Sequence, residues 1–147
     1  RTVQYREWFI LKKNSLEEFI KKVKNKNLEK IITFFGYTNE PEEKLANSDI
    51  LIRPSVLNDP WGRDTIEALS NGIPVITHGQ YDKFVKNNFT GILLPKWNVY
   101  DYARSIKNIN RKELNAWSQN ALDLAIKNFN TRKYSKKITN IYLSLLN

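Results

Sequence analysis

The sequence RPSVLNDPWGRDTIEALSNGIPV occupies residues 53–75 and links two short apolar segments, residues 49–52 and 74–77. Both segments predict buried strands, because short Ile-, Leu- and Val-rich runs are typical of parallel sheets. A helix is expected between them over Arg63–Asn71, ending where Gly72 can adopt the left-handed C-terminal cap. This strand–helix–strand order predicts a parallel βαβ unit.

The remaining segments continue the same alternation. Further strands are expected at residues 3–11, 31–35 and 91–94. Further helices are expected from Asn14 or Ser15 to Lys26 and at residues 41–46, 99–109, 112–129 and 131–146. The fold class is therefore α/β, a Rossmann-like doubly wound parallel sheet with a helical C-terminal segment. All of it is expected to form one domain over residues 1–147.

The loop before the Arg63 helix carries the groups expected of a ligand site, because ligands bind at the carboxyl ends of such strands. The backbone N–H groups of Trp61, Gly62 and Arg63 lie at the predicted helix N-terminus, a position that binds anions. Two carboxylates, Asp59 and Glu67, lie at the same end of the sheet and can accept hydrogen bonds from hydroxyls. A nucleotide sugar presents phosphates and hydroxyls together, so this combination fits it.

These residues also resemble the signature of a known family. Retaining glycosyltransferases of the GT-B fold (glycosyl transferases group 1, the glycogen-synthase-like and mannosyltransferase-like group) carry Pro-Ser, Glu-Pro-Phe-Gly, a helical Glu-Ala and Gly-x-Pro-Val. This chain is similar at Pro54–Ser55, Asp59–Gly62, Glu67–Ala68 and Gly72–Val75, in order and at matching spacing. The resemblance covers the chain from about Ile31 to the C-terminus.

The resemblance implies a donor-binding domain of an enzyme that moves a sugar from a nucleoside diphosphate sugar to an acceptor, with retention at the anomeric carbon. It implies catalytic roles for Asp59 on the donor sugar's hydroxyls and for Glu67 on the ribose hydroxyls. Tyr37 and Thr38 would lie near the nucleobase, and the amides at the helix start would hold the diphosphate. The donor-binding residues implied are Tyr37, Thr38, Asp59, Trp61, Gly62, Arg63 and Glu67.

Three features depart from that family. The first carboxylate is Asp59 where the family has Glu. The Gly-Arg and Lys-Gly segment that grips the diphosphate has no counterpart here, so either it lies upstream or one of Arg1, Arg6, Lys12 and Lys13 replaces it. The acceptor-binding N-terminal domain is also missing from a chain of 147 residues without methionine. We therefore expect a fragment of a longer protein, inactive in transfer by itself.

The composition excludes several functional classes. The chain has no cysteine, which excludes disulfides, zinc–thiolate sites and cysteine nucleophiles. It has one histidine, His78, which is expected to be a solvated loop residue rather than a catalytic one. No metal and no cofactor besides the donor are expected. No apolar run approaches the ~20 residues of a membrane span. The absence of cysteine fits a reducing compartment, so a cytoplasmic location is expected, where basic residues would permit peripheral membrane contact.

The net charge of +9 keeps two alternatives open. A nucleic-acid-binding module is motivated by this charge and by the basic stretch Arg132–Lys137, but no nucleic-acid-binding motif accompanies it, so no such partner is expected. A non-catalytic interaction subunit is motivated by Asp59 and by the absent basic pair. A homodimer is a further option if the sheet leaves an exposed edge.

Overall fold

The computed structural model describes residues 16–55 and 62–146. Two compact units make up the chain, residues 1–39 and residues 40–147. The strand expected at residues 3–11 and the expected helix caps before residue 16 lie outside the described part.

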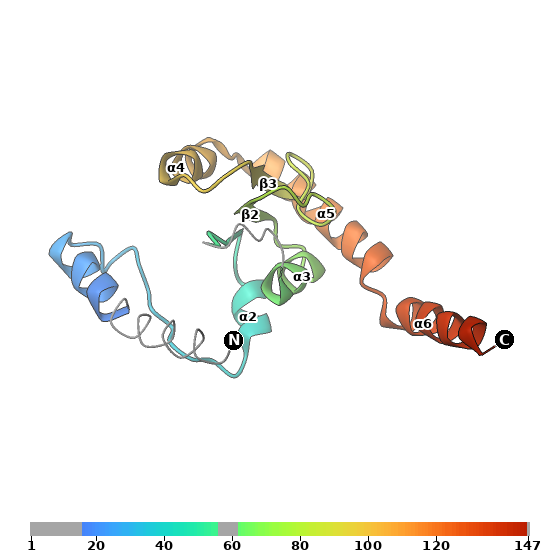
Figure 1. Ribbon diagram of the computed structural model, residues 1–147. Helices are drawn as coiled ribbons and strands as arrows, with labels where there is room; N and C mark the ends of the chain where they lie inside the picture. The colour runs from blue at the N-terminus through green and yellow to red at the C-terminus, as the bar shows by residue number, and fades with distance from the viewer. Residues whose placement is uncertain (1–15, 56–61, 147) are drawn as a thin grey trace. The chain divides into compact units, whose positions relative to one another are not determined.

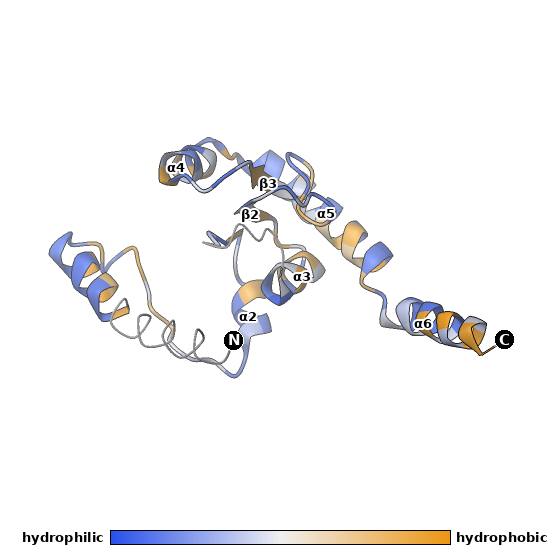
Figure 2. Ribbon diagram, viewed as in Figure 1, coloured by the Kyte–Doolittle hydropathy of each residue, from blue (hydrophilic) through white to orange (hydrophobic). Residues whose placement is uncertain are grey.

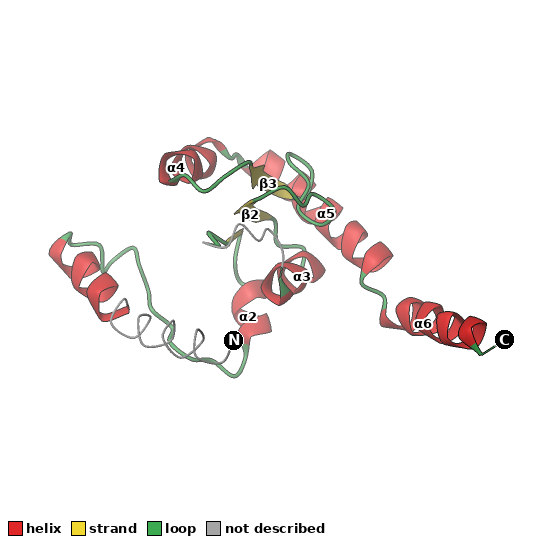
Figure 3. Cartoon of the chain, in the orientation of Figure 1, coloured by secondary structure: helices red, strands yellow, loops and turns green. Residues whose placement is uncertain are grey.

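The described part of the first unit contains a helix followed by an irregular segment (Figure 3). Residues 16–25 are helical, which confirms the expected helix. The strand expected at residues 31–35 is wrong. The N–H groups of Ile31 and Ile32 both donate to the carbonyl of Leu28, at 2.9 Å each, in the turn that follows the helix. In a strand these N–H groups would donate to the carbonyls of a neighbouring strand, so the hydrogen bonds of this turn exclude strand pairing here.

The second unit is built on a parallel sheet with the spatial order β1-β2-β3, of which Figure 1 labels β2 and β3. Its strands are β1 (Leu51–Ile52), β2 (Val75–His78) and β3 (Gly91–Leu94). The register places Leu51 opposite Val75 and Val75 opposite Gly91. This parallel sheet with its helices confirms the expected α/β fold class. β2 is buried along its whole length, whereas Ile52 on β1 is 41% exposed because β1 has a partner on one side only in the described sheet.

The helices of the second unit begin and end within one residue of the expected positions. They are α2 (Pro41–Ala46), α3 (Arg63–Ser70), α4 (Val99–Asn108), α5 (Arg111–Asn128) and α6 (Thr131–Leu145). Asparagine side chains at Asn98, Asn110 and Asn130 accept hydrogen bonds from the first turns of α4, α5 and α6. Gly72 follows α3 with a φ of +70°, which confirms the expected left-handed cap.

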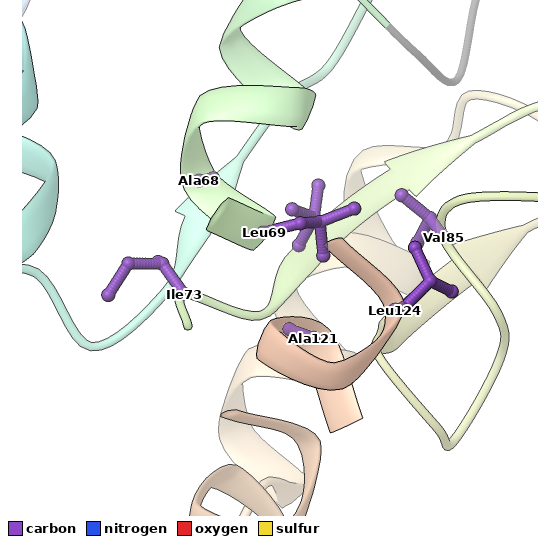
Figure 4. Packing of buried hydrophobic residues seen from close by; sticks show 7 residues of the cluster. Ala68, Leu69, Ile73, Val85, Ala121 and Leu124 are labelled. Carbon is purple, nitrogen blue, oxygen red and sulfur yellow. The ribbon is translucent and has the colours of Figure 1, made fainter. Parts of the chain in front are cut away.

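The core lies where α3 packs against α5 and β2 (Figure 4). Leu69 of α3 is fully buried, and Ala121 and Leu124 of α5 face it. The remaining buried members of this cluster are Ala68, Ile73, Val75 and Val85. Burying a leucine of this kind contributes about 2 kcal/mol. This packing fixes α3 against the sheet and therefore fixes where its N-terminus lies.

α6 has no buried residue, and it carries both hydrophobic and hydrophilic residues (Figure 2). Its exposed apolar residues include Ile138, Ile141 and Leu145. Within residues 16–55 and 62–146, no helix combines the length and the apolar character needed to cross a bilayer.

Candidate functional site

Three described segments meet at the carboxyl edge of the sheet: the chain leaving β1, the start of α3 and the end of β2. Thr77 Oγ1 on β2 donates a hydrogen bond to the carbonyl of Arg53 at 3.1 Å. The Nε of Arg53 donates to the Asp64 carboxylate in the first turn of α3 at 2.8 Å. This edge is where open parallel sheets bind ligands, so it is the candidate site.

α3 begins at Arg63, and Gly62 is its N-cap residue and makes no side-chain capping hydrogen bond. The first N–H groups of any helix have no intrahelical partner, and the helix dipole adds partial positive charge, so such an end attracts anions. A Cβ built on Gly62 would lie 2.8 Å from Asp64 Oδ1 and 2.9 Å from Arg53 Nη2. Both atoms are the ends of flexible side chains, and the φ of −178° suits any residue, so a larger residue at position 62 would push these side-chain ends aside without straining the backbone. The expected helix N-terminus at this position is confirmed.

Glu67 lies one turn into α3 and its side chain is 24% exposed. Its Oε1 accepts a hydrogen bond from Nε of Arg63 at 2.5 Å, an i,i+4 pair on the helix surface. The hydrogen bond to Glu67 raises the pKa of the Arg63 guanidinium, whose side chain is 87% exposed. A carboxylate has more acceptor sites than one N–H uses, so Glu67 can also accept from a ligand hydroxyl.

Arg53 and Asp64 form an ion pair that sequence reasoning missed. Nε of Arg53 lies 3.0 Å and 2.8 Å from the two Asp64 oxygens, and Asp64 Oδ1 also accepts from the N–H of Thr65 at 2.9 Å. The Arg53 side chain is 18% exposed and that of Asp64 is 50% exposed. The available sequence signal was that opposite charges stand at the end of a predicted strand and in the first turn of the following helix.

His78 corrects a sequence expectation, because it is the last residue of β2 and only 1% exposed rather than solvated. Its Nδ1 lies 2.8 Å from the Tyr102 hydroxyl on α4, and that hydroxyl donates to the carbonyl of Arg53 at 3.2 Å. Burial lowers the pKa of the His78 imidazole, and a hydrogen bond with the Ser55 backbone opposes that shift. Burial raises the pKa of the Tyr102 hydroxyl, which therefore stays protonated and able to donate.

At this edge the structure places three predicted site residues, Gly62, Arg63 and Glu67. Asp59 and Trp61 lie outside the described residues, and Tyr37 and Thr38 belong to the first unit. A hollow of 730 Å³ lies elsewhere, between residues 81–89 and α5, and shares no residue with the edge described above. In the described ranges, no three His, Asp or Glu side chains form a group that could hold a metal ion.

Residues 12–124 match the family Glycosyl transferases group 1. A curated relative, the UDP-Gal:alpha-D-GlcNAc-diphosphoundecaprenol alpha-1,3-galactosyltransferase of Escherichia coli, is 28% identical over 123 residues, 82% of this chain and 32% of that protein. The poly(ribitol-phosphate) alpha-N-acetylglucosaminyltransferase of Staphylococcus aureus is 25% identical, over 87% of this chain and 27% of its own length. The chain thus spans about a third or less of these relatives.

Solved structures share the fold. Anabaena HepE in complex with UDP superposes with a TM-score of 0.82 at 20% identity, covering 90% of this chain and 37% of that one. The C-terminal domain of LpcC, a glycosyl transferase group 1 family protein of Francisella tularensis, gives a TM-score of 0.68 at 22% identity, covering 80% of this chain and 64% of that one. Both share the α/β fold described above. Because the family match spans residues 12–124 of 147, this chain belongs to the glycosyl transferases group 1 family.

Proposed function

We propose that this chain is the donor-binding part of a retaining hexosyltransferase and holds a nucleoside diphosphate sugar. The observation that carries the proposal is the start of α3, which has a glycine cap without a side chain at the carboxyl edge of the sheet. Glu67 follows one turn later on the same helix, with its side chain 24% exposed. The helix N-terminus suits the diphosphate of a nucleoside diphosphate, and the Glu67 carboxylate suits its ribose hydroxyls.

Each residue of the proposed site has a distinct role. The amides of Gly62 and Arg63 bind the donor diphosphate, which gains charge as the sugar leaves, so they stabilise the transition state electrostatically. Glu67 accepts hydrogen bonds from the ribose hydroxyls. Asp59 accepts from hydroxyls of the transferred sugar, and the amide of Trp61 adds a further diphosphate contact.

The names of the relatives support this donor class. One relative is named for UDP-Gal and both are named for alpha-linked transfer, while HepE is solved with UDP bound. Common UDP-hexoses carry the sugar in α-linkage, so an α-linked product corresponds to retention. We propose that transfer needs no metal ion. We also propose that the acceptor binds to a further domain of the intact protein, since the chain spans 32% and 27% of these relatives.

Nucleotide binding tests the proposal. UDP, GDP and ADP are each titrated into the intact protein by calorimetry, and one of them is expected to bind. Glu67→Gln removes a charged acceptor for the ribose and should weaken that binding about tenfold, since hydrogen bonds to charged groups contribute ~1.5–3 kcal/mol. Glu43→Gln, on the exposed helix α2, is the matched control and should bind normally. Absence of binding by all three nucleotides at millimolar concentration would refute the proposal.

A second substitution at Glu67, measured in a transfer assay, separates an enzyme from a non-catalytic interaction subunit of this fold. In the enzyme, Glu67→Ala should lower the rate of sugar transfer by the intact protein. An unchanged transfer rate would mean that Glu67 plays no part in the reaction and would favour the non-catalytic alternative for this domain.

A further inference from the structure

We propose that Arg53 is a positioning residue of the donor site, which holds the Asp64 carboxylate and cancels its charge where the donor diphosphate binds. This inference rests on the proposed function, because it assigns Arg53 a task at the same helix N-terminus. Its basis is a set of hydrogen bonds that hold the backbone of Arg53 from one side and its side chain from the other.

The backbone of Arg53 is anchored by two neighbouring elements. Its N–H donates to the carbonyl of Ile76 at 2.9 Å, and its carbonyl accepts from Thr77 Oγ1 at 3.1 Å and from the Tyr102 hydroxyl at 3.2 Å. Both donors are buried, Thr77 fully and Tyr102 with 6% exposed. His78 holds Tyr102 in turn, through the 2.8 Å contact of Nδ1 with the hydroxyl. The backbone position of Arg53 after β1 is therefore fixed by hydrogen bonds to β2 and α4.

The side chain of Arg53 extends from that point to the start of α3. Its Nε contacts both oxygens of Asp64, and a Cβ on Gly62 would lie 2.9 Å from its Nη2. The guanidinium thus lies beside the N-cap, next to the amides proposed to hold the diphosphate. These bonds use the backbone N–H and carbonyl of residue 53, so changing its side chain leaves them in place.

Asp64 makes this cation necessary. A carboxylate in the first turn stabilises the helix itself, and Asp64 Oδ1 already accepts from the N–H of Thr65. The same negative charge repels a diphosphate that approaches the helix end. Arg53 offsets that charge, because its guanidinium is positive at every physiological pH. The ion pair thus keeps a stabilising carboxylate in the first turn of α3 without leaving a net negative charge beside the anion position.

One single and one double variant test this assignment through nucleotide binding. In the intact protein, Arg53→Gln should raise the dissociation constant for the bound nucleotide about tenfold, because Asp64 is left unbalanced. Arg53→Gln combined with Asp64→Asn should recover the affinity to within about threefold of the wild type, because the repelling charge is gone. In transfer assays, the single variant should raise the donor KM with little change in kcat.

The recovery separates a charge effect from a structural one, because removing Asp64 cannot repair lost packing. Arg111→Gln is the matched control: it breaks another arginine–aspartate pair, with Asp49 before β1, and should leave binding unchanged. If the wild type binds a nucleotide and Arg53→Gln binds it with the same dissociation constant, this inference is overturned and the proposed function is not affected. A double variant as weak as Arg53→Gln overturns it as well. No binding by the wild type removes the proposed function itself.

Discussion

Replacing Gly91 with alanine should be among the most destabilising single changes in the second unit. Gly91 opens β3 opposite Val75 and has a φ of +146°, a region that side chains with a Cβ rarely adopt. A Cβ at Gly91 would lie 2.0 Å from the carbonyl oxygen of Val75 and 2.7 Å from its nitrogen. Both are backbone atoms of the central strand, so the two strands must separate locally.

The size of the effect follows from two contributions. Holding alanine at this φ costs about 1–3 kcal/mol. Separating the strands weakens about two ladder hydrogen bonds, each contributing about 1 kcal/mol. We therefore expect Gly91→Ala to lower the free energy of unfolding by about 3–5 kcal/mol.

Gly72→Ala is the matched control for this measurement. Gly72 also has a positive φ, +70°, but its Cβ would meet only side-chain atoms of Leu122 and Ser118, at 3.0–3.2 Å, which can shift. It should cost about 1–2 kcal/mol, the ordinary penalty of the left-handed region. Urea denaturation followed by circular dichroism measures both variants. If Gly91→Ala lowers the free energy of unfolding no more than Gly72→Ala does, β2 and β3 do not approach each other as closely at Gly91 as the structure shows.

Two further predictions concern stability. Burial lowers the pKa of His78 from its ordinary value of 6.5. Below about pH 6.5 the unfolded chain therefore takes up a proton that the folded chain does not, and the free energy of unfolding should fall as the pH drops. His78→Gln should flatten that slope in urea denaturation between about pH 5 and 8, and an equally steep slope would contradict the assignment. Asn110→Ala removes the capping box with Glu113 at the start of α5 and should cost about 1 kcal/mol in the same assay, whereas no change would mean that this cap is not formed in solution.

Local sequence determined the helices, because their signals act within a few residues. Pro41 begins α2, Asn98 and Asn110 cap α4 and α5, and Gly72 closes α3. These effects are short-range hydrogen bonds and backbone preferences, so the sequence pattern alone located the elements correctly. The strand–helix–strand order around residues 53–75 predicted the parallel sheet for the same reason.

The strand expected at residues 31–35 shows where that reasoning stops. An apolar run predicts a strand only if a neighbouring strand takes its N–H groups, and here two of those groups bond to Leu28 instead. Pairing is a property of the folded chain, which a local pattern does not contain.

The interior of the candidate site was likewise decided by tertiary structure. Arg53 meets Asp64 across 11 residues, His78 meets Tyr102 across 24, and Tyr102 reaches the carbonyl of Arg53 across 49. The sequence named the helix N-terminus and Glu67, because a motif at fixed spacing marks them. It could not show that a lone histidine is buried against a tyrosine. That contact exists only because β2 and α4 are packed together, and packing brings together residues that no sequence spacing relates.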